Sequence, residues 1–85
     1  MKVRMTRLAI KEEVFKALQE IAPDAALEEV APNDSLRDVP DIGAGGFLNL
    51  MTRLRSDLNV EIPESDYDRV STLTELVRYL SDRLR

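Results

Sequence analysis

The sequence predicts an all-α fold, a bundle of three longer helices and one short third helix with a long loop between the first two helices. Hydrophobic residues make up 44% of the chain and are mostly Leu, Val, Ile and Ala, with only two Phe and two Tyr, while 33% of residues are charged. Such a composition is typical of helical proteins. In three segments the apolar residues also recur at spacings of three and four, the period of an amphipathic helix.

The first helix is predicted between about Thr6 and Ile21. Its apolar face consists of residues three or four positions apart: Ile10, Val14, Phe15, Leu18 and Ile21. Pro23 ends the helix, because proline restricts the residue before it and cannot continue the hydrogen-bond ladder.

The connection from Pro23 to Gly43 is unusually long for a small domain. Loops of this length are generally functional or anchored by their own side chains. Six acidic residues and a single basic residue, Arg37, lie in this segment. We expect an ordered loop laid across the bundle, with a helical turn near Ala25–Glu29. Its expected anchors are apolar: Leu27, Val30, Leu36, Val39 and Ile42.

The second helix follows the run Gly43-Ala44-Gly45-Gly46, which holds all three glycines of the protein. Glycine in a helix costs about 1 kcal/mol relative to alanine, so a frayed start is expected. The helix is predicted to end near Asp57–Asn59. Its apolar face consists of Phe47, Leu48, Leu50, Met51, Leu54 and Leu58.

The residues after the second helix predict a short extended segment, a helical turn and a final helix. Residues 60–63 are expected to be extended, and residues 66–70 are compatible with one helical turn. Thr72 and Glu75 have the spacing of a capping box, which marks the start of the last helix. The apolar face of that helix consists of Leu73, Leu76, Val77, Leu80 and Leu84.

The chain length predicts one domain, residues 1–85, near the lower limit for a single core. The chain has no cysteine and no histidine, so an aliphatic core must supply nearly all of the stability. We predict a core formed by Ile10, Val14, Leu18, Leu36, Phe47, Leu50, Leu54, Leu58, Ile62, Val70, Leu73, Leu76, Val77 and Leu80.

Charge and composition exclude several functions. The net charge of −4 and pI of about 4.8 argue against nucleic acid as a partner, because phosphate neutralisation needs a basic surface. No apolar stretch is long enough to span a bilayer. The basic N-terminus lacks the apolar run of a signal peptide, so a cytoplasmic protein is expected. Without His or Cys there is no conventional nucleophile–base pair; we therefore expect no enzyme, no catalytic residue and no metal site.

The helix order and the segment Leu54-x-x-x-Leu58-Asn59-Val60-Glu61-Ile62-Pro63 resemble the acyl and peptidyl carrier proteins, over essentially the full chain. In that family the second helix ends in an apolar residue, two variable positions, an acid and Ile-Pro. Two further segments fit the resemblance. They are the loop Pro32–Asp38 before the modified site, and Val70-Ser71-Thr72-Leu73 at the start of the fourth helix.

The resemblance implies a site for phosphopantetheine that this sequence has altered. The family carries the group on a serine within Asp-Ser-Leu or Asp-Ser-Met at the start of the second helix, where free amides and the helix dipole favour a phosphodiester. Counting back from Glu61-Ile62-Pro63 without gaps places that serine at position 44, where the sequence has Ala44 between Gly43 and Gly45. Alanine has no hydroxyl. We therefore expect no cofactor as the sequence stands, and phosphopantetheine only if the native residue is serine.

The triplet Asp34-Ser35-Leu36 spells the family motif but lies well upstream of position 44. Pro40 prevents a long helix from starting there. We interpret Asp34 and Ser35 as a turn capped by side chains, with Leu36 in the core.

Two explanations of Ala44 remain open: an engineered serine-to-alanine change, or a natural carrier-like protein without the attachment chemistry. The replaced neighbours, Gly43 and Gly45, favour the second. The corresponding functions are an acyl carrier protein of fatty-acid, polyketide or specialised metabolite biosynthesis, and a carrier-like protein–protein interaction module that is not acylated.

The resemblance implies biosynthetic enzymes as partners: an acyl or aminoacyl ligase, a synthase and a phosphopantetheinyl transferase. The chain itself is expected to be a monomer. Carrier proteins usually present acids on the second helix, whereas Asp57 is the only acid on this exposed face. The acids lie instead in the preceding loop and in residues 61–68, where charge complementarity favours a basic partner. The partner contacts expected on the second helix are Phe47, Leu48, Met51 and Arg55.

Overall fold

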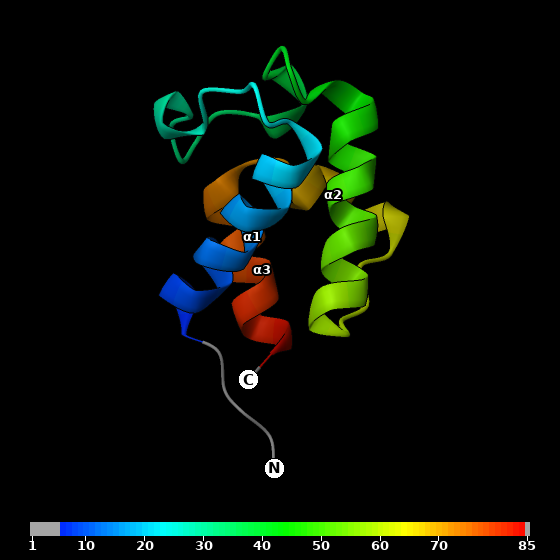
Figure 1. Cartoon of the computed structure of the whole chain (residues 1–85). Coiled ribbons are helices and arrows are strands. Elements are labelled where there is room, and N and C mark those ends of the chain that lie inside the picture. The colour runs from blue at the N-terminus through cyan, green and yellow to red at the C-terminus, as the bar shows by residue number, and fades with distance from the viewer. Residues whose placement is uncertain (1–5, 85) are drawn as a thin grey trace.

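The computed structural model describes residues 6–84, which form three α-helices and three short 3₁₀ turns. The α-helices are α1 (Arg7–Ile21), α2 (Gly43–Leu58) and α3 (Leu73–Arg83), and the turns are η1 (Leu27–Glu29), η2 (Leu36–Asp38) and η3 (Glu64–Arg69). Figure 1 shows α1, α2 and α3 gathered around one core, with the long loop crossing one end of the bundle. The predicted all-α class is confirmed. The short third helix is present as the 3₁₀ turn η3.

The ends of α1 and α3 are set by local hydrogen bonds. The Thr6 hydroxyl accepts the Ala9 N–H at 3.1 Å and caps α1. At the start of α3, the Thr72 hydroxyl accepts the Glu75 N–H at 3.1 Å, and the Glu75 carboxylate accepts the Thr72 N–H at 3.3 Å. This is the reciprocal pairing of a capping box, as the spacing of these two residues predicts.

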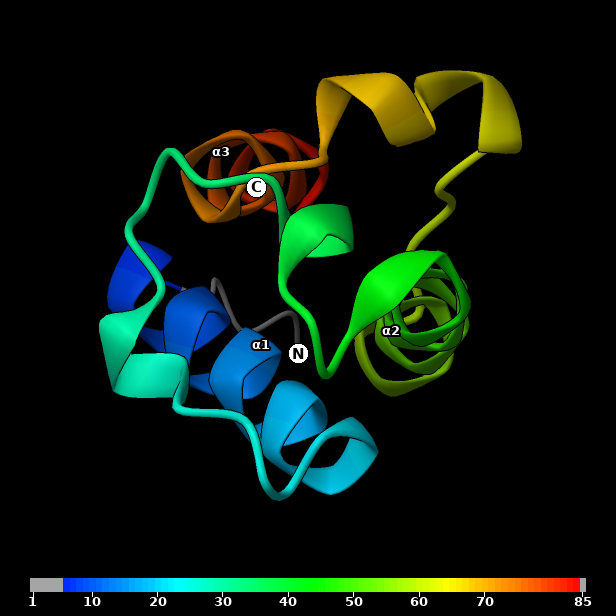
Figure 2. The ribbon, with the colours of Figure 1, turned by 90° about the horizontal axis from the view of Figure 1, so that it is seen from above.

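The long loop is ordered by apolar anchors. Leu27, Leu36 and Ile42 are buried, while Val30 and Val39 are partly buried against the core. Backbone hydrogen bonds also tie the loop to α3: the Leu36 N–H donates to the Ser71 carbonyl at 2.7 Å, and the Thr74 N–H donates to the Pro32 carbonyl. The expected helical turn forms as η1. Figure 2 shows the loop passing over the ends of α1 and α3 before it enters α2.

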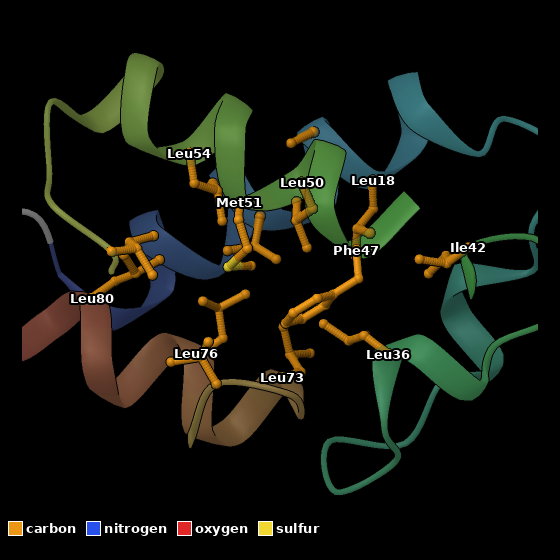
Figure 3. Packing of buried hydrophobic residues seen from close by; sticks show 14 of the residues in the cluster. Leu18, Leu36, Ile42, Phe47, Leu50, Met51, Leu54, Leu73, Leu76 and Leu80 are labelled. Carbon is orange, nitrogen blue, oxygen red and sulfur yellow. The ribbon is translucent and has the colours of Figure 1, made fainter. Parts of the chain in front are cut away.

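The core lies between the three α-helices and is closed by the loop. Figure 3 shows side chains of α2 meeting Leu73, Leu76 and Leu80 of α3, with Leu36 at one end. Leu58 and Val77 were expected in this core but are only partly buried, because each lies at the edge of its helix's apolar face. Of the buried residues outside the predicted core, Leu27 and Ile42 were expected as loop anchors and Met51 on the apolar face of its helix. Ala17 and Ala22 were not predicted to be buried.

The turn η3 is held against α3 by polar contacts. The Tyr79 hydroxyl donates to the Asp66 carboxylate at 2.7 Å, and the Arg83 guanidinium lies 3.5 Å from the same carboxylate. Burial, and next the hydrogen bond to Asp66, raise the pKa of the Tyr79 hydroxyl above its ordinary value. These contacts connect the segment after α2 to the last helix.

Truncation of Leu54 tests this core. Leu54→Ala removes a side chain with 0% exposure and leaves a cavity, so the free energy of unfolding should fall by about 2–5 kcal/mol. Leu48→Ala is the matched control, because Leu48 is 51% exposed on the same helix and its truncation should change stability by less than about 0.5 kcal/mol. Urea denaturation measures both; equal midpoints for the two variants would contradict the packing described.

Candidate functional site

The candidate site predicted from the sequence is the glycine turn at the start of α2, residues 43–46. Ile42 precedes the helix with φ −100° and ψ −64°, and no side chain caps the helix. Gly43 follows with φ +62°, in the left-handed region that costs other residues free energy. The N–H groups of Ile42 and Gly43 both donate to the Val39 carbonyl, at 2.9 and 3.0 Å. The chain therefore makes a tight turn into α2 that depends on glycine at position 43.

α2 begins at Gly43, whose own φ is positive, and the turn that follows Gly43 is helical, although a frayed start was expected from its glycines. The Gly46 N–H donates to the Ile42 carbonyl at 2.9 Å, which closes the first helical turn. Ile42 and Phe47, on either side of the turn, are both buried. A Cβ at position 46 would lie 3.0 Å from Cγ2 of Ile42. Packing on both sides thus offsets the low helix propensity of the glycines.

Ala44 lies exposed in this first turn. Within the described residues, the N–H groups of Ala44 and Gly45 have no hydrogen-bond acceptor. Free amides at the positive end of a helix dipole stabilise negative charge. The turn consequently has the electrostatic setting that suits a phosphodiester.

The covalent chemistry of such a site is nevertheless absent. Phosphopantetheine is joined to its protein through a side-chain hydroxyl, and residues 43–51 contain no Ser, Thr or Tyr. The first hydroxyl in α2 belongs to Thr52, and it donates to the Leu48 carbonyl at 3.1 Å. The residues present therefore do not fit the attached group at position 44.

The upstream triplet Asp34-Ser35-Leu36 has a structural role. The Asp34 carboxylate accepts the Ala31 N–H at 3.1 Å, and Leu36 is fully buried, as predicted for both. The Ser35 side chain does not cap the turn, which corrects part of the interpretation. Ser35 instead forms an isolated antiparallel bridge with Thr72. This segment joins the loop to α3 and starts no long helix.

A cluster around Phe47 connects the loop, α2 and η3. The Arg37 guanidinium lies 4.9 Å from the centre of the Phe47 ring, and the Tyr67 ring meets Phe47 edge-on at 5.9 Å. Arg37 also donates to the Asp68 carboxylate at 2.8 Å and to the Tyr67 carbonyl at 3.3 Å. In the sequence, Arg37 is distinguished only as the one basic residue of an acidic loop. No spacing motif links these residues, since they come from three separate elements.

The outer face of α2 carries only part of the expected partner surface. Phe47 and Met51 are 1% and 0% exposed, so their assignment as partner contacts is wrong: both point into the core, where the helix needs large apolar side chains. Leu48 and Arg55 are exposed. Arg53 forms an ion pair with Glu20 of α1, which leaves the exposed face of α2 mostly neutral.

The comparisons with known proteins identify the family. The family model described as the phosphopantetheine attachment site matches residues 12–80, which is most of the chain and includes α2 and most of α3. The chain belongs to this family. No match was found among the curated proteins or among the solved structures.

Membership defines the class of the protein: it is a carrier protein of the acyl or peptidyl carrier type. Domains of this family are carriers rather than catalysts, they normally bear phosphopantetheine, and they interact with biosynthetic enzymes. Within residues 6–84, no helix has the length and apolar character needed to cross a membrane. The same residues contain no group of three or more acidic side chains placed to hold a metal ion.

Alanine substitutions at two glycines test the geometry of the turn. Gly43→Ala forces a Cβ into the left-handed region and should destabilise the protein by about 1–2 kcal/mol. Gly45→Ala should stabilise it by about 0.4–1 kcal/mol, because the unfolded chain loses freedom and a Cβ at position 45 meets nothing within 4 Å. Thermal unfolding of both variants measures the difference; the same direction of change in both would contradict this backbone.

Proposed function

We propose that this chain is a carrier protein of fatty-acid, polyketide or related specialised biosynthesis whose position 44 cannot take phosphopantetheine as the sequence stands. The observation that carries the proposal is Ala44. It lies exposed at the start of α2 beside free backbone amides, in a chain of the carrier family. The proposal treats residues 1–85 as one domain that acts as a monomer.

The proposed role of the fold is recognition and positioning. An acyl or aminoacyl ligase, a synthase and a phosphopantetheinyl transferase are the partners that the family relationship supports. Leu48 and Arg55 are the contacts that we propose on α2, because both are exposed on its outer face. An apolar side chain and a cation two helical turns apart on one face suit a partner surface with an apolar pocket and an acidic edge.

A second candidate is a carrier-like interaction module that is never acylated. It is favoured by the extent of the change at the turn, where Gly43, Ala44 and Gly45 all depart from the family motif. Gly43 adopts a positive φ, which is less favourable for the aspartate of that motif. The backbone of the turn is thus adapted to glycine, beyond the loss of one hydroxyl.

Intact mass distinguishes the two functions. The protein and its Ala44→Ser variant are each incubated with coenzyme A and a broad-specificity phosphopantetheinyl transferase. For a carrier scaffold disabled only at position 44, the variant gains the mass of the arm and the unaltered protein does not. Ser35→Ala in the Ala44→Ser background is the matched control and should still be loaded.

The other outcomes are equally informative. If neither protein gains mass, the surface is not recognised by that transferase and the interaction module becomes the better account. If the unaltered protein is loaded, the assignment of position 44 is wrong, and loss of loading in Ser35→Ala alone would identify the serine used.

A further inference from the structure

Three basic side chains line a groove between α1 and α3, although the chain as a whole is acidic. The cavity measures about 210 Å³ and is lined by Arg7 and Lys11 of α1 and by Arg78 of α3. We call it the basic groove. Its apolar lining consists of Pro32, Leu73 and Val77. No carboxylate lines it within the described part of the chain, although the protein has 16 acidic and 12 basic residues.

The three cations of the groove are not neutralised by neighbours. Among residues 6–84, the side chains of Arg7 and Arg78 take part in no ion pair and no hydrogen bond. Lys11 lies over the Phe15 ring at 5.9 Å, a contact that leaves its charge in place. All three side chains are exposed. Elsewhere the arginines Arg37, Arg53 and Arg83 each face a carboxylate.

We propose that the basic groove is a docking site for an acidic segment of a partner protein, in which carboxylate side chains flank one aliphatic side chain. Arginine pairs with carboxylates through two parallel hydrogen bonds, and the groove has one arginine from α1, Arg7, and one from α3, Arg78. Since a water molecule takes about 30 Å³, the cavity has room for one aliphatic side chain over Leu73 and Val77.

Charge favours an acidic segment in the groove over two other occupants, the chain's own N-terminus and an anionic membrane. The chain's own N-terminus is a poor fit, because residues 1–11 contain four basic residues and no acidic one. An anionic membrane is an extended surface that would also face the acids responsible for the net charge of −4. A short acidic segment contacts the basic groove without facing the acidic surface around it.

The groove lies away from the candidate carrier site. In Figure 2 the start of α1 and the loop around residues 30–35 lie on the left of the bundle, while α2 lies on the right. A partner held in the basic groove therefore leaves the first turn of α2 accessible. The proposal does not depend on whether position 44 can be loaded.

The test is a titration of ¹⁵N-labelled protein with the peptide acetyl-Asp-Glu-Leu-Glu-Asp-amide, followed through the backbone amide resonances. Saturable shifts are expected in residues 7–11 and 73–78, with residues 43–58 unmoved. Raising NaCl to about 0.5 M should weaken the apparent affinity about tenfold, because exposed charges are screened. A control peptide of opposite charge, acetyl-Lys-Arg-Leu-Arg-Lys-amide, should give no shifts in the groove.

Charge reversal provides the matched comparison. Lys11→Glu with Arg78→Glu should abolish the shifts, whereas Lys16→Glu with Arg69→Glu, the same change in net charge at exposed positions outside the groove, should leave them intact. Lys11→Gln removes one charge without reversing it, so it tests the groove even if the double variant fails to fold. It should reduce the affinity for the acidic peptide severalfold. Equal effects of the two double variants, or shifts spread over the whole surface, would overturn the proposal. So would binding to phosphatidylserine vesicles through Lys11 and Arg78 without binding of the acidic peptide.

Discussion

The packing of the loop, α2 and η3 depends on the buried ring of Phe47. The ring belongs to α2 and is 1% exposed, yet it is also the surface on which Arg37 of η2 and Tyr67 of η3 pack. Figure 3 shows Phe47 pointing from α2 toward Leu36 and Leu73. Residues ten to thirty positions apart in the sequence are thus held together around one side chain. Aromatic and cation–π contacts of this type add to the free energy gained from burying the ring.

This arrangement explains how the first turn of α2 is held without a capping side chain. Ile42 and Phe47 are fixed in the core on either side of the turn, so the backbone between them is positioned by its ends. The exposed residue at position 44 can then vary without loss of the fold. The side chain at position 44 is exposed and takes no part in the core, so the scaffold does not depend on which residue stands there. The family relationship persists in a chain with Ala44 at the start of α2.

Local and periodic features of the sequence predicted most of the fold. The spacing of Ile10, Val14 and Leu18 gave the face of α1, the Thr72–Glu75 pair gave the start of α3, and the apolar loop residues gave its anchors. Periodicity could not separate the core side of α2 from its outer side at every position, so Met51 was assigned to a partner surface and Phe47 was assigned both to the core and to that surface. The Arg37 cluster and the basic groove were not predicted, because each joins residues from separate elements that no local pattern relates.

The central claim is that Phe47 holds the loop, the start of α2 and η3 together, and hydrogen exchange tests it most directly. Phe47→Leu retains an apolar side chain but removes the ring contacts with Arg37 and Tyr67. Protection of the amides of Leu36, Gly46 and Val70, which donate to the carbonyls of Ser71, Ile42 and Tyr67, should then fall more than protection of the Ile10 amide at the start of α1. An equal fall at all four amides, or no fall at the first three, would contradict the claim.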